Sequence, residues 1–172
     1  MLFLVRHAMP VVDPAVAPAD WVLSAQGRAA AQALVQLLPP DAYLVASAEP
    51  KAAQTLQDAG EPRIDGRFGE VVRVGEPFGG DFLALRRAYV EGTDHPGWEP
   101  RAQVVARFDA AVGDQARAAA GRPLVVATHG MAMTTWLTAR LGLDDPGVFW
   151  AGLQFPDVLE VDLTTRRIAR CR

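Results

Sequence analysis

Short apolar runs alternate along the chain with longer stretches in which apolar residues recur at helical spacing. The runs at residues 2–5, 42–46 and 124–127 are four or five residues long and predict buried strands. Residues 158–168 alternate apolar and acidic side chains before a turn at Thr164-Thr165. This last pattern predicts a half-buried strand that continues into a hairpin.

Helices are expected in the stretches between these strands. Ser24 is placed to cap the N-terminus of one helix, Pro50 suits the first turn of another, and Gly142 suits a C-terminal cap. The predicted helices cover residues 25–38, 50–60, 81–89, 101–120 and 131–141. The remaining central segments predict loop with an edge strand at 61–77 and loop at 92–97.

The order of these elements indicates an α/β fold. Strands that alternate with helices favour a three-layer sandwich, with a mostly parallel central sheet flanked by helices. A length of 172 residues suits a single domain over residues 1–172. Ligands of such sheets lie beyond the carboxyl ends of the strands. His7 and His129 both follow the end of a predicted strand.

Composition narrows the classes of function. Half of the residues are hydrophobic and 22% are charged, as in ordinary globular proteins. The net charge of −3 argues against a nucleic-acid partner. The single cysteine, Cys171, excludes an internal disulfide, and the apolar N-terminal run is too short for a signal peptide or membrane span. We therefore expect a cytoplasmic protein with no membrane contact; a homodimer stays open.

The two histidines at strand ends suggest a phosphate site. Arg6 precedes His7, and His129 leads directly into a helix whose first backbone N–H groups favour an anion. An idle, solvated Arg-His pair at a strand end is the structural alternative. A metal site is less favoured, since there is no HExxH pattern and no paired acids accompany the histidines.

Several short segments resemble motifs of one family. Residues 4–8, Leu-Val-Arg-His-Ala, resemble the strand-end Arg-His-Gly signature of the histidine phosphatase superfamily, which has the phosphoglycerate mutase-like fold. Further resemblances follow in the family's order at residues 23–33, at 47–56, at Glu70 with Gly75, and at 128–130. Together they extend from residue 2 to about 140, and in this order they are jointly specific.

The resemblance implies a mechanism for these residues. His7 would attack phosphorus and become phosphohistidine. Arg6, Lys51, His129 and the backbone at Gly130 would hold the phosphoryl oxygens. Glu70 would act as the catalytic acid and base, which calls for a pKa raised towards neutrality. No metal or other cofactor is expected.

Two departures from the family pattern affect these expectations. Lys51 stands where the family usually has arginine, and it supplies one compact charge in place of a planar fork of donors. Met9-Pro10 replaces residues that are often polar in the family. The assignment of Glu70 also has rivals in other acidic residues, namely Glu76, Asp81 and Glu99.

The function expected from the sequence is hydrolysis of phosphomonoesters. The substrate would be a small phosphorylated metabolite or a phosphorylated protein side chain, and the loops at residues 9–22 and 74–97 would select it. A non-catalytic phosphate-binding or regulatory module is the alternative that Lys51 and Met9-Pro10 motivate. A phosphosugar mutase ranks lower, because the chain is short for the insertions that enclose the substrate of larger mutases.

Overall fold

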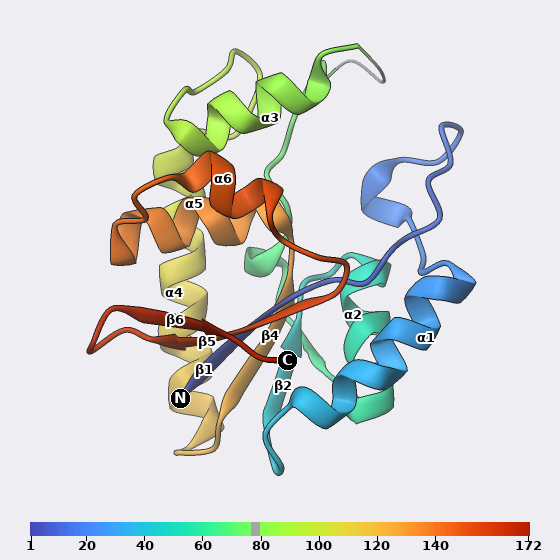
Figure 1. Cartoon of the computed structure of the whole chain (residues 1–172), viewed down its shortest axis with the longest axis vertical. Coiled ribbons are helices and arrows are strands. Elements are labelled where there is room, and N and C mark those ends of the chain that lie inside the picture. Colours follow the sequence, from blue (N-terminus) through green and yellow to red (C-terminus); the bar gives the residue numbers. More distant parts are fainter. Residues whose placement is uncertain (77–79) are drawn as a thin grey trace.

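In the part of the chain that the structure describes, six strands form one mixed sheet at the centre of the molecule (Figure 1). The computed structural model describes residues 1–76 and 80–172. The strand order is β3-β2-β4-β1-β5-β6. The strands are β1 (Leu2–Arg6), β2 (Tyr43–Ala46), β3 (Arg63–Ile64), β4 (Leu124–Thr128), β5 (Asp157–Asp162) and β6 (Arg167–Arg170).

The sheet is mostly parallel, as the sequence predicts. β1 and β2 each run parallel to β4, and β3 runs parallel to β2. At the other edge, β5 runs antiparallel to β1 and forms an antiparallel hairpin with β6. β1 lies between β4 and β5, so its backbone is hydrogen-bonded on both sides. The predicted hairpin at Thr164-Thr165 is confirmed.

Helices cover both faces of the sheet, which confirms the predicted layered α/β architecture. They are α1 (Ala25–Leu34), α2 (Pro50–Leu56), α3 (Phe82–Glu91), α4 (Arg101–Ala119), α5 (Gly130–Leu141) and α6 (Pro146–Ala151). α1 and α2 lie against one face and α4 and α5 against the other, while α3 and α6 pack together beyond the strand ends (Figure 1).

The continuous apolar runs follow from this double coverage. In β1, Leu2 and Leu4 belong to the core beneath α4 and α5, whereas Phe3 and Val5 belong to the core beneath α1 and α2. A strand buried on both faces needs apolar side chains at every position, and this is why β1 and β4 read as unbroken hydrophobic segments.

Element ends differ from the expectations in a few places. Two predicted helices are shorter than expected: the one over 25–38 is α-helical only to Leu34, and the one from Pro50 only to Leu56, each continuing as a short 3₁₀ turn. The predicted edge strand within 61–77 is β3, although Pro77, like Phe78 and Gly79 of the expected 74–97 loop, lies outside the described residues. The short helix α6 has no counterpart among the predicted helices.

A helix must be both long and apolar to cross a bilayer. None of the described helices meets both requirements.

Candidate active site

Strand register brings the two histidines together. β1 and β4 are parallel, with Arg6 opposite Thr128, so His7 and His129 are the first residues beyond the same end of adjacent strands. The His7 backbone N–H continues the ladder by donating to the Thr128 carbonyl at 3.1 Å. The two imidazole centroids are 5.1 Å apart. Residues that are far apart in the sequence therefore share one site.

His7 is held as a neutral imidazole with one nitrogen free to react. Its Nδ1 lies 2.8 Å from the Ala8 carbonyl oxygen. Because a carbonyl only accepts, Nδ1 carries the proton and Nε2 keeps the lone pair. Burial, with the nearby charges of His129, Lys51 and Arg6, lowers the pKa of His7 to about 3. A neutral imidazole at pH 7 is the form that can act as a nucleophile.

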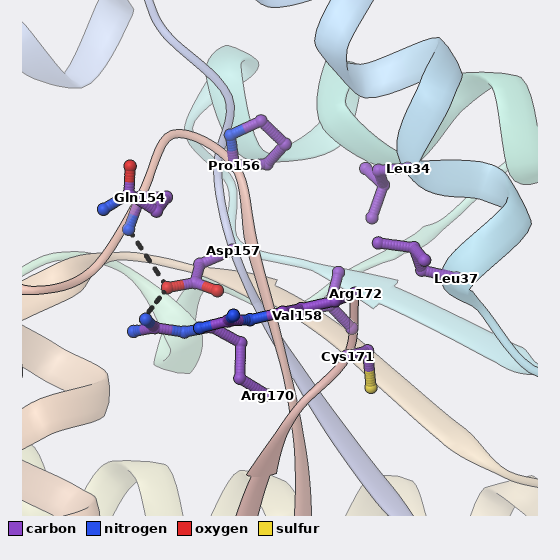
Figure 2. Close-up of a pocket in the computed structure, with 9 residues that line it drawn as sticks. All are labelled: Leu34, Leu37, Gln154, Pro156, Asp157, Val158, Arg170, Cys171 and Arg172. Atoms are coloured by element: carbon purple, nitrogen blue, oxygen red, sulfur yellow. Dashed lines mark hydrogen bonds and ion pairs between the residues drawn. The ribbon is translucent and has the colours of Figure 1, made fainter.

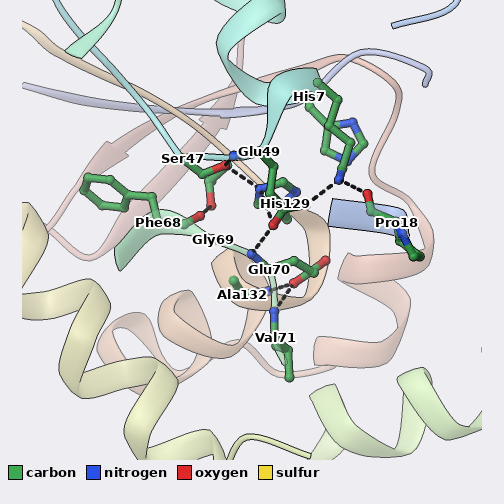
Figure 3. A network of polar contacts seen from close by, with 12 residues as sticks. His7, Pro18, Ser47, Glu49, Phe68, Gly69, Glu70, Val71, His129 and Ala132 are labelled. Atoms are coloured by element: carbon green, nitrogen blue, oxygen red, sulfur yellow. Dashed lines mark hydrogen bonds and ion pairs between the residues drawn. The ribbon is translucent and has the colours of Figure 1, made fainter. Parts of the chain in front are cut away.

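His129 is fully buried, and among the residues that the structure describes only one of its nitrogens has a partner. Nε2 lies 2.7 Å from Ser47 Oγ and 3.2 Å from Glu49 Oε1. Figure 3 shows the residues of this network. Burial lowers the pKa of His129 to about 3, although the charge of Glu70 acts to raise it. Its Nδ1 is buried and has no hydrogen-bond partner among the described residues.

Arg6 also has a buried donor without a partner. Its guanidinium stacks on the Phe155 ring at 3.4 Å from the centroid, and one terminal nitrogen donates to the Leu153 carbonyl at 2.7 Å. Within the described part of the chain, Nε is left without an acceptor. A Cβ placed on Gly130 would lie 3.3 Å from this Nε, so Arg6 borders the first turn of α5. Buried donors are rarely left unpaired, and a guanidinium N–H left free beside a helix N-terminus favours an anion.

Lys51 adds a second cationic side chain beside Arg6. It lies in the first turn of α2 and is only 5% exposed. Its Nζ donates to the Pro18 carbonyl at 2.7 Å and forms an ion pair with the Glu49 carboxylate. The lysine thus connects the loop before α1 to the site. Its charge contributes to the lowered pKa of His7, which places it within electrostatic range of that imidazole.

Glu70 caps α5. Its carboxylate accepts hydrogen bonds from the backbone N–H groups of Met131, Ala132 and Val71 at 2.9–3.2 Å. Burial acts to raise the pKa of Glu70, but the charges of Arg73 and His129 and the N–H donors outweigh it and bring the pKa to about 2. The expectation that this pKa is raised towards neutrality is therefore wrong. An ionised carboxylate is a poor proton donor.

The acidic rivals of Glu70 are occupied by other partners or lie at the surface. Glu76 pairs with Arg73 and Arg86, and Glu99 pairs with Arg107. Asp81 stands at the N-terminus of α3 and is exposed.

Glu49 is the site residue that reasoning from the sequence missed. Its carboxylate contacts His129, pairs with Lys51, and accepts the backbone N–H of Glu70 at 2.8 Å (Figure 3). In the sequence it is only one position of the 47–56 motif. Its place between Ser47 and Lys51, both of which reach the site, is the signal that could have identified it.

At the departure Met9-Pro10, contacts of the Met9 backbone that do not depend on its side chain hold the chain in place. The Met9 carbonyl accepts from the backbone N–H and hydroxyl of Ser24, each at 3.0 Å. A Cβ on Gly27 would lie 2.0 Å from the same carbonyl oxygen, so the glycine permits this close approach. The backbone after His7 is thereby fixed to the N-terminus of α1.

A pocket elsewhere contains none of these residues. It has a volume of about 320 Å³ and lies where β5 begins, between α1 and the C-terminal residues (Figure 2). Its buried carboxylate, Asp157, is already paired with Arg170 and the backbone of Gln154. In the described ranges, no three His, Cys, Asp or Glu side chains are grouped as a metal site would require. The strand ends therefore define the candidate site.

Known proteins share this architecture. A mycobacterial glucosyl-3-phosphoglycerate phosphatase has a similar structure, with a TM-score of 0.72, 21% identity, and coverage of 98% of this chain and 95% of that one. A protein from Thermus thermophilus has a similar structure with a TM-score of 0.70 and 25% identity, and the match covers 99% of this chain and 98% of that one. The product of an open reading frame of Mycobacterium tuberculosis has a TM-score of 0.70 and 19% identity, and the match covers 99% of this chain and 95% of that one.

Sequence comparison gives the family. A search of curated proteins finds no match to the chain. The family model of the histidine phosphatase superfamily (branch 1) matches residues 2–168, which is nearly the whole chain. This confirms the predicted resemblance: the chain belongs to the histidine phosphatase superfamily, the phosphoglycerate mutase-like family.

Proposed function

We propose that this protein is a phosphatase that hydrolyses phosphomonoesters through a phosphohistidine on His7, without a metal ion. The observation that carries the proposal is the pair of buried, unpartnered nitrogens among the described residues, Arg6 Nε and His129 Nδ1, beside a neutral imidazole. The nitrogens provide places for phosphoryl oxygens, and His7 Nε2 provides the electron pair that attacks phosphorus.

The cationic groups have a defined task in this reaction. Negative charge on the phosphoryl oxygens must be balanced as the bond to the leaving oxygen breaks. Arg6, Lys51 and His129 would share this task with the backbone N–H at Gly130, where the helix dipole of α5 also favours an anion. Protein cations can supply this stabilisation, so the proposed mechanism needs no metal ion.

The similar structures support hydrolysis. One is described as a phosphatase of glucosyl-3-phosphoglycerate, and another as a mycobacterial hydrolase. For this chain we propose the broader class, a small phosphorylated molecule or a phosphorylated protein side chain.

Hydrolysis of an aryl phosphate in the presence of a chelator tests the proposal. The parent protein is expected to release phosphate and to acquire an acid-labile, alkali-stable phosphoryl group during turnover. His7→Ala is expected to lose both, because no other described imidazole has its position at the end of β1. His95→Gln is the matched control, since His95 bonds to the Leu85 carbonyl and packs on Trp98, outside the site.

The outcomes separate the alternatives. Equal turnover by His7→Ala, or loss of activity on chelation, would contradict the proposed mechanism. Binding of inorganic phosphate without turnover of any ester would favour the non-catalytic module. Movement of a phosphoryl group between two hydroxyls of one sugar acid would favour the mutase.

A further inference from the structure

The short segment that leads into β5 reaches the site from the side opposite to β4. β1 lies between β4 and β5, and Arg6 is the register partner of Thr128 on one side and of Asp157 on the other. The chain enters β5 through residues 153–156, which therefore lie beside the end of β1, where Arg6 and His7 stand. β4 thus brings a histidine to the site along one edge of β1, and this segment reaches it along the other.

The segment contributes an aromatic ring that contacts both residues. The Arg6 guanidinium carbon lies 3.4 Å from the centroid of the half-buried Phe155 ring, and the His7 ring lies 5.3 Å from it, centroid to centroid. The face of a phenyl ring carries negative charge density and attracts a cation. Burial lowers the pKa of Arg6 to about 10, which still leaves the guanidinium charged at pH 7. Phe155 and Arg6 therefore form a cation–π pair.

A second contact fixes the direction of the guanidinium. One terminal nitrogen of Arg6 donates to the Leu153 carbonyl at 2.7 Å. Stacking sets the plane of the group and this hydrogen bond sets its rotation within that plane, so together they set the position of Nε. This Nε is buried and without a partner among the described residues, and a Cβ on Gly130 would lie 3.3 Å from it. The free donor thus stands at the start of α5, where an anion is favoured.

The segment that makes both contacts is itself held in place. Asp157 is only 5% exposed; it accepts the backbone N–H of Gln154 at 3.0 Å and pairs with Arg170 at 2.9 Å. Leu153 and Phe155 flank Gln154, so the Asp157 contact fixes the backbone that carries them. A donor held in place before its ligand arrives loses less conformational entropy on binding.

We propose that Phe155 is a positioning residue, whose ring, together with the Leu153 carbonyl, holds the Arg6 guanidinium so that Nε meets a phosphoryl oxygen. This inference rests on the phosphate site of the proposed function. Phe155 would act on the phosphoryl group, which all monoesters share, and not on the organic group that leaves. Its removal should therefore affect esters with and without an aromatic ring alike.

Removal of the aromatic face tests this role. Phe155→Leu keeps an apolar side chain but has no ring to attract the guanidinium. Arg6 should then take other positions in the free protein, and part of the binding free energy of phosphate should be used to bring it back. We expect the dissociation constant of inorganic phosphate, measured by titration calorimetry, to rise about tenfold. Phe149→Leu is the matched control, because Phe149 packs against the core, and the constant should not change.

Fluorinated rings separate the attraction between ring and cation from packing. Mono-, di- and trifluorinated phenylalanine at position 155 nearly keep the shape of the ring, while fluorine withdraws electron density from its face. The dissociation constant of phosphate should rise stepwise along this series, and the same series at position 149 should leave it unchanged. This measurement stays decisive if Phe155→Leu folds poorly. The absence of any trend at position 155 would overturn the inference.

Two esters with similar leaving groups show where Phe155 acts. Benzyl phosphate and propyl phosphate both release a primary alcohol, but only the first carries a ring. Phe155→Leu should lower kcat/KM for both esters by the same factor. A loss confined to benzyl phosphate would mean that Phe155 contacts the organic group of the substrate, and the positioning role would be wrong.

The results distinguish this inference from the proposed function. Phosphate binding is measured without turnover, so a rise in the dissociation constant supports the role of Phe155 even if the parent protein forms no phosphohistidine, in which case only the proposed function fails. If the parent protein forms phosphohistidine but the Phe155 variants bind phosphate as tightly as the parent, only the inference fails. If the parent protein binds no inorganic phosphate, both fail.

Discussion

Gly130 allows Arg6 to approach the start of α5. A Cβ at this position would lie 3.3 Å from both Arg6 Nε and Trp150 Nε1, which is closer than ordinary van der Waals contact. Arg6 has little room to move, since it is stacked on Phe155 and bonded to the Leu153 carbonyl. The glycine thus serves the phosphate site through the space it leaves, in addition to its backbone N–H.

Gly130→Ala should therefore separate activity from stability. The added methyl group should displace the Arg6 guanidinium and weaken inhibition by inorganic phosphate roughly tenfold, the loss of about one hydrogen bond to a charged group. Stability should not fall by more than about 1 kcal/mol, because alanine has the better helix propensity. Inhibition constants and urea unfolding measure the two effects.

Gly113→Ala is the control for this substitution. Gly113 lies within α4, and a Cβ there would be 3.6 Å from the Arg117 guanidinium, an ordinary contact. This variant should gain stability with unchanged phosphate inhibition. Equal effects of the two substitutions on inhibition would contradict the assigned role of Gly130.

At the scale of elements, Glu70 joins the loop after β3 to the N-terminus of α5. Its carboxylate satisfies the N–H groups of Met131 and Ala132, two donors that the helix itself cannot pair. A negative charge at this end also interacts favourably with the helix dipole. Because α5 packs against α4 and α6, this cap connects the site to the surrounding core.

Loss of this cap should be measurable as a loss of stability. Glu70→Gln is expected to lower the free energy of unfolding by about 1–2 kcal/mol, the usual cost of weakening a helix cap and its charge interaction. Urea unfolding at pH 7 measures this difference. Glu61→Gln makes the same chemical change in the loop before β3 and should have little effect. A Glu70→Gln protein as stable as the parent would show that the cap contributes nothing.

The elements that build the site could be predicted from sequence because their patterns are local. β1 and β4 are unbroken apolar runs, and Ser24 caps α1 as expected. The sequence pattern does not predict α6, because a helix of six residues is too short to show a helical period. Its N-terminus is fixed by the Asp145 side chain, which accepts the Val148 N–H. A single capping contact of this kind leaves only a weak trace in the sequence.

The arrangement of acids within the site could not be predicted in the same way. Glu49 and Glu70 are 21 positions apart, and nothing local indicates that the carboxylate of one accepts the backbone N–H of the other. Their different partners, His129 and Lys51 for Glu49 and the start of α5 for Glu70, follow from the packing of α2 and α5 at neighbouring strand ends. That information lies in tertiary structure.

At the scale of the whole molecule, the fold buries ionisable groups at the carboxyl end of its sheet. His7 and His129 have pKa values near 3, lowered from 6.5 chiefly by burial. Asp65 and Glu70 have pKa values near 2; burial opposes both shifts, but Arg67 lowers the pKa of Asp65 and the contacts described above lower that of Glu70. Unfolding returns all four groups to water.

Stability should consequently decline in two stages as the pH falls. Below about pH 6.5 the unfolded chain binds protons at both histidines while the folded protein does not until about pH 3, so each contributes a loss of at most about 1.4 kcal/mol per pH unit across that window. Below about pH 4.5 the two carboxylates add a second loss, which continues to about pH 2. Above about pH 7 neither the two histidines nor the two carboxylates make the free energy of unfolding depend on pH.

Urea unfolding between about pH 8 and pH 4 tests this linkage. The parent protein should show a flat free energy of unfolding above about pH 7 and a steady decline below about pH 6.5. His7→Gln removes one of the two buried imidazoles, so the decline between about pH 6.5 and 4.5 should become shallower, whatever the variant's stability at higher pH. Identical slopes for the two proteins would mean that His7 takes up its proton equally in both states. Its imidazole would then be too well solvated to remain neutral by burial, and the Ala8 hydrogen bond could not replace burial, because it fixes the tautomer but acts to raise the pKa of His7.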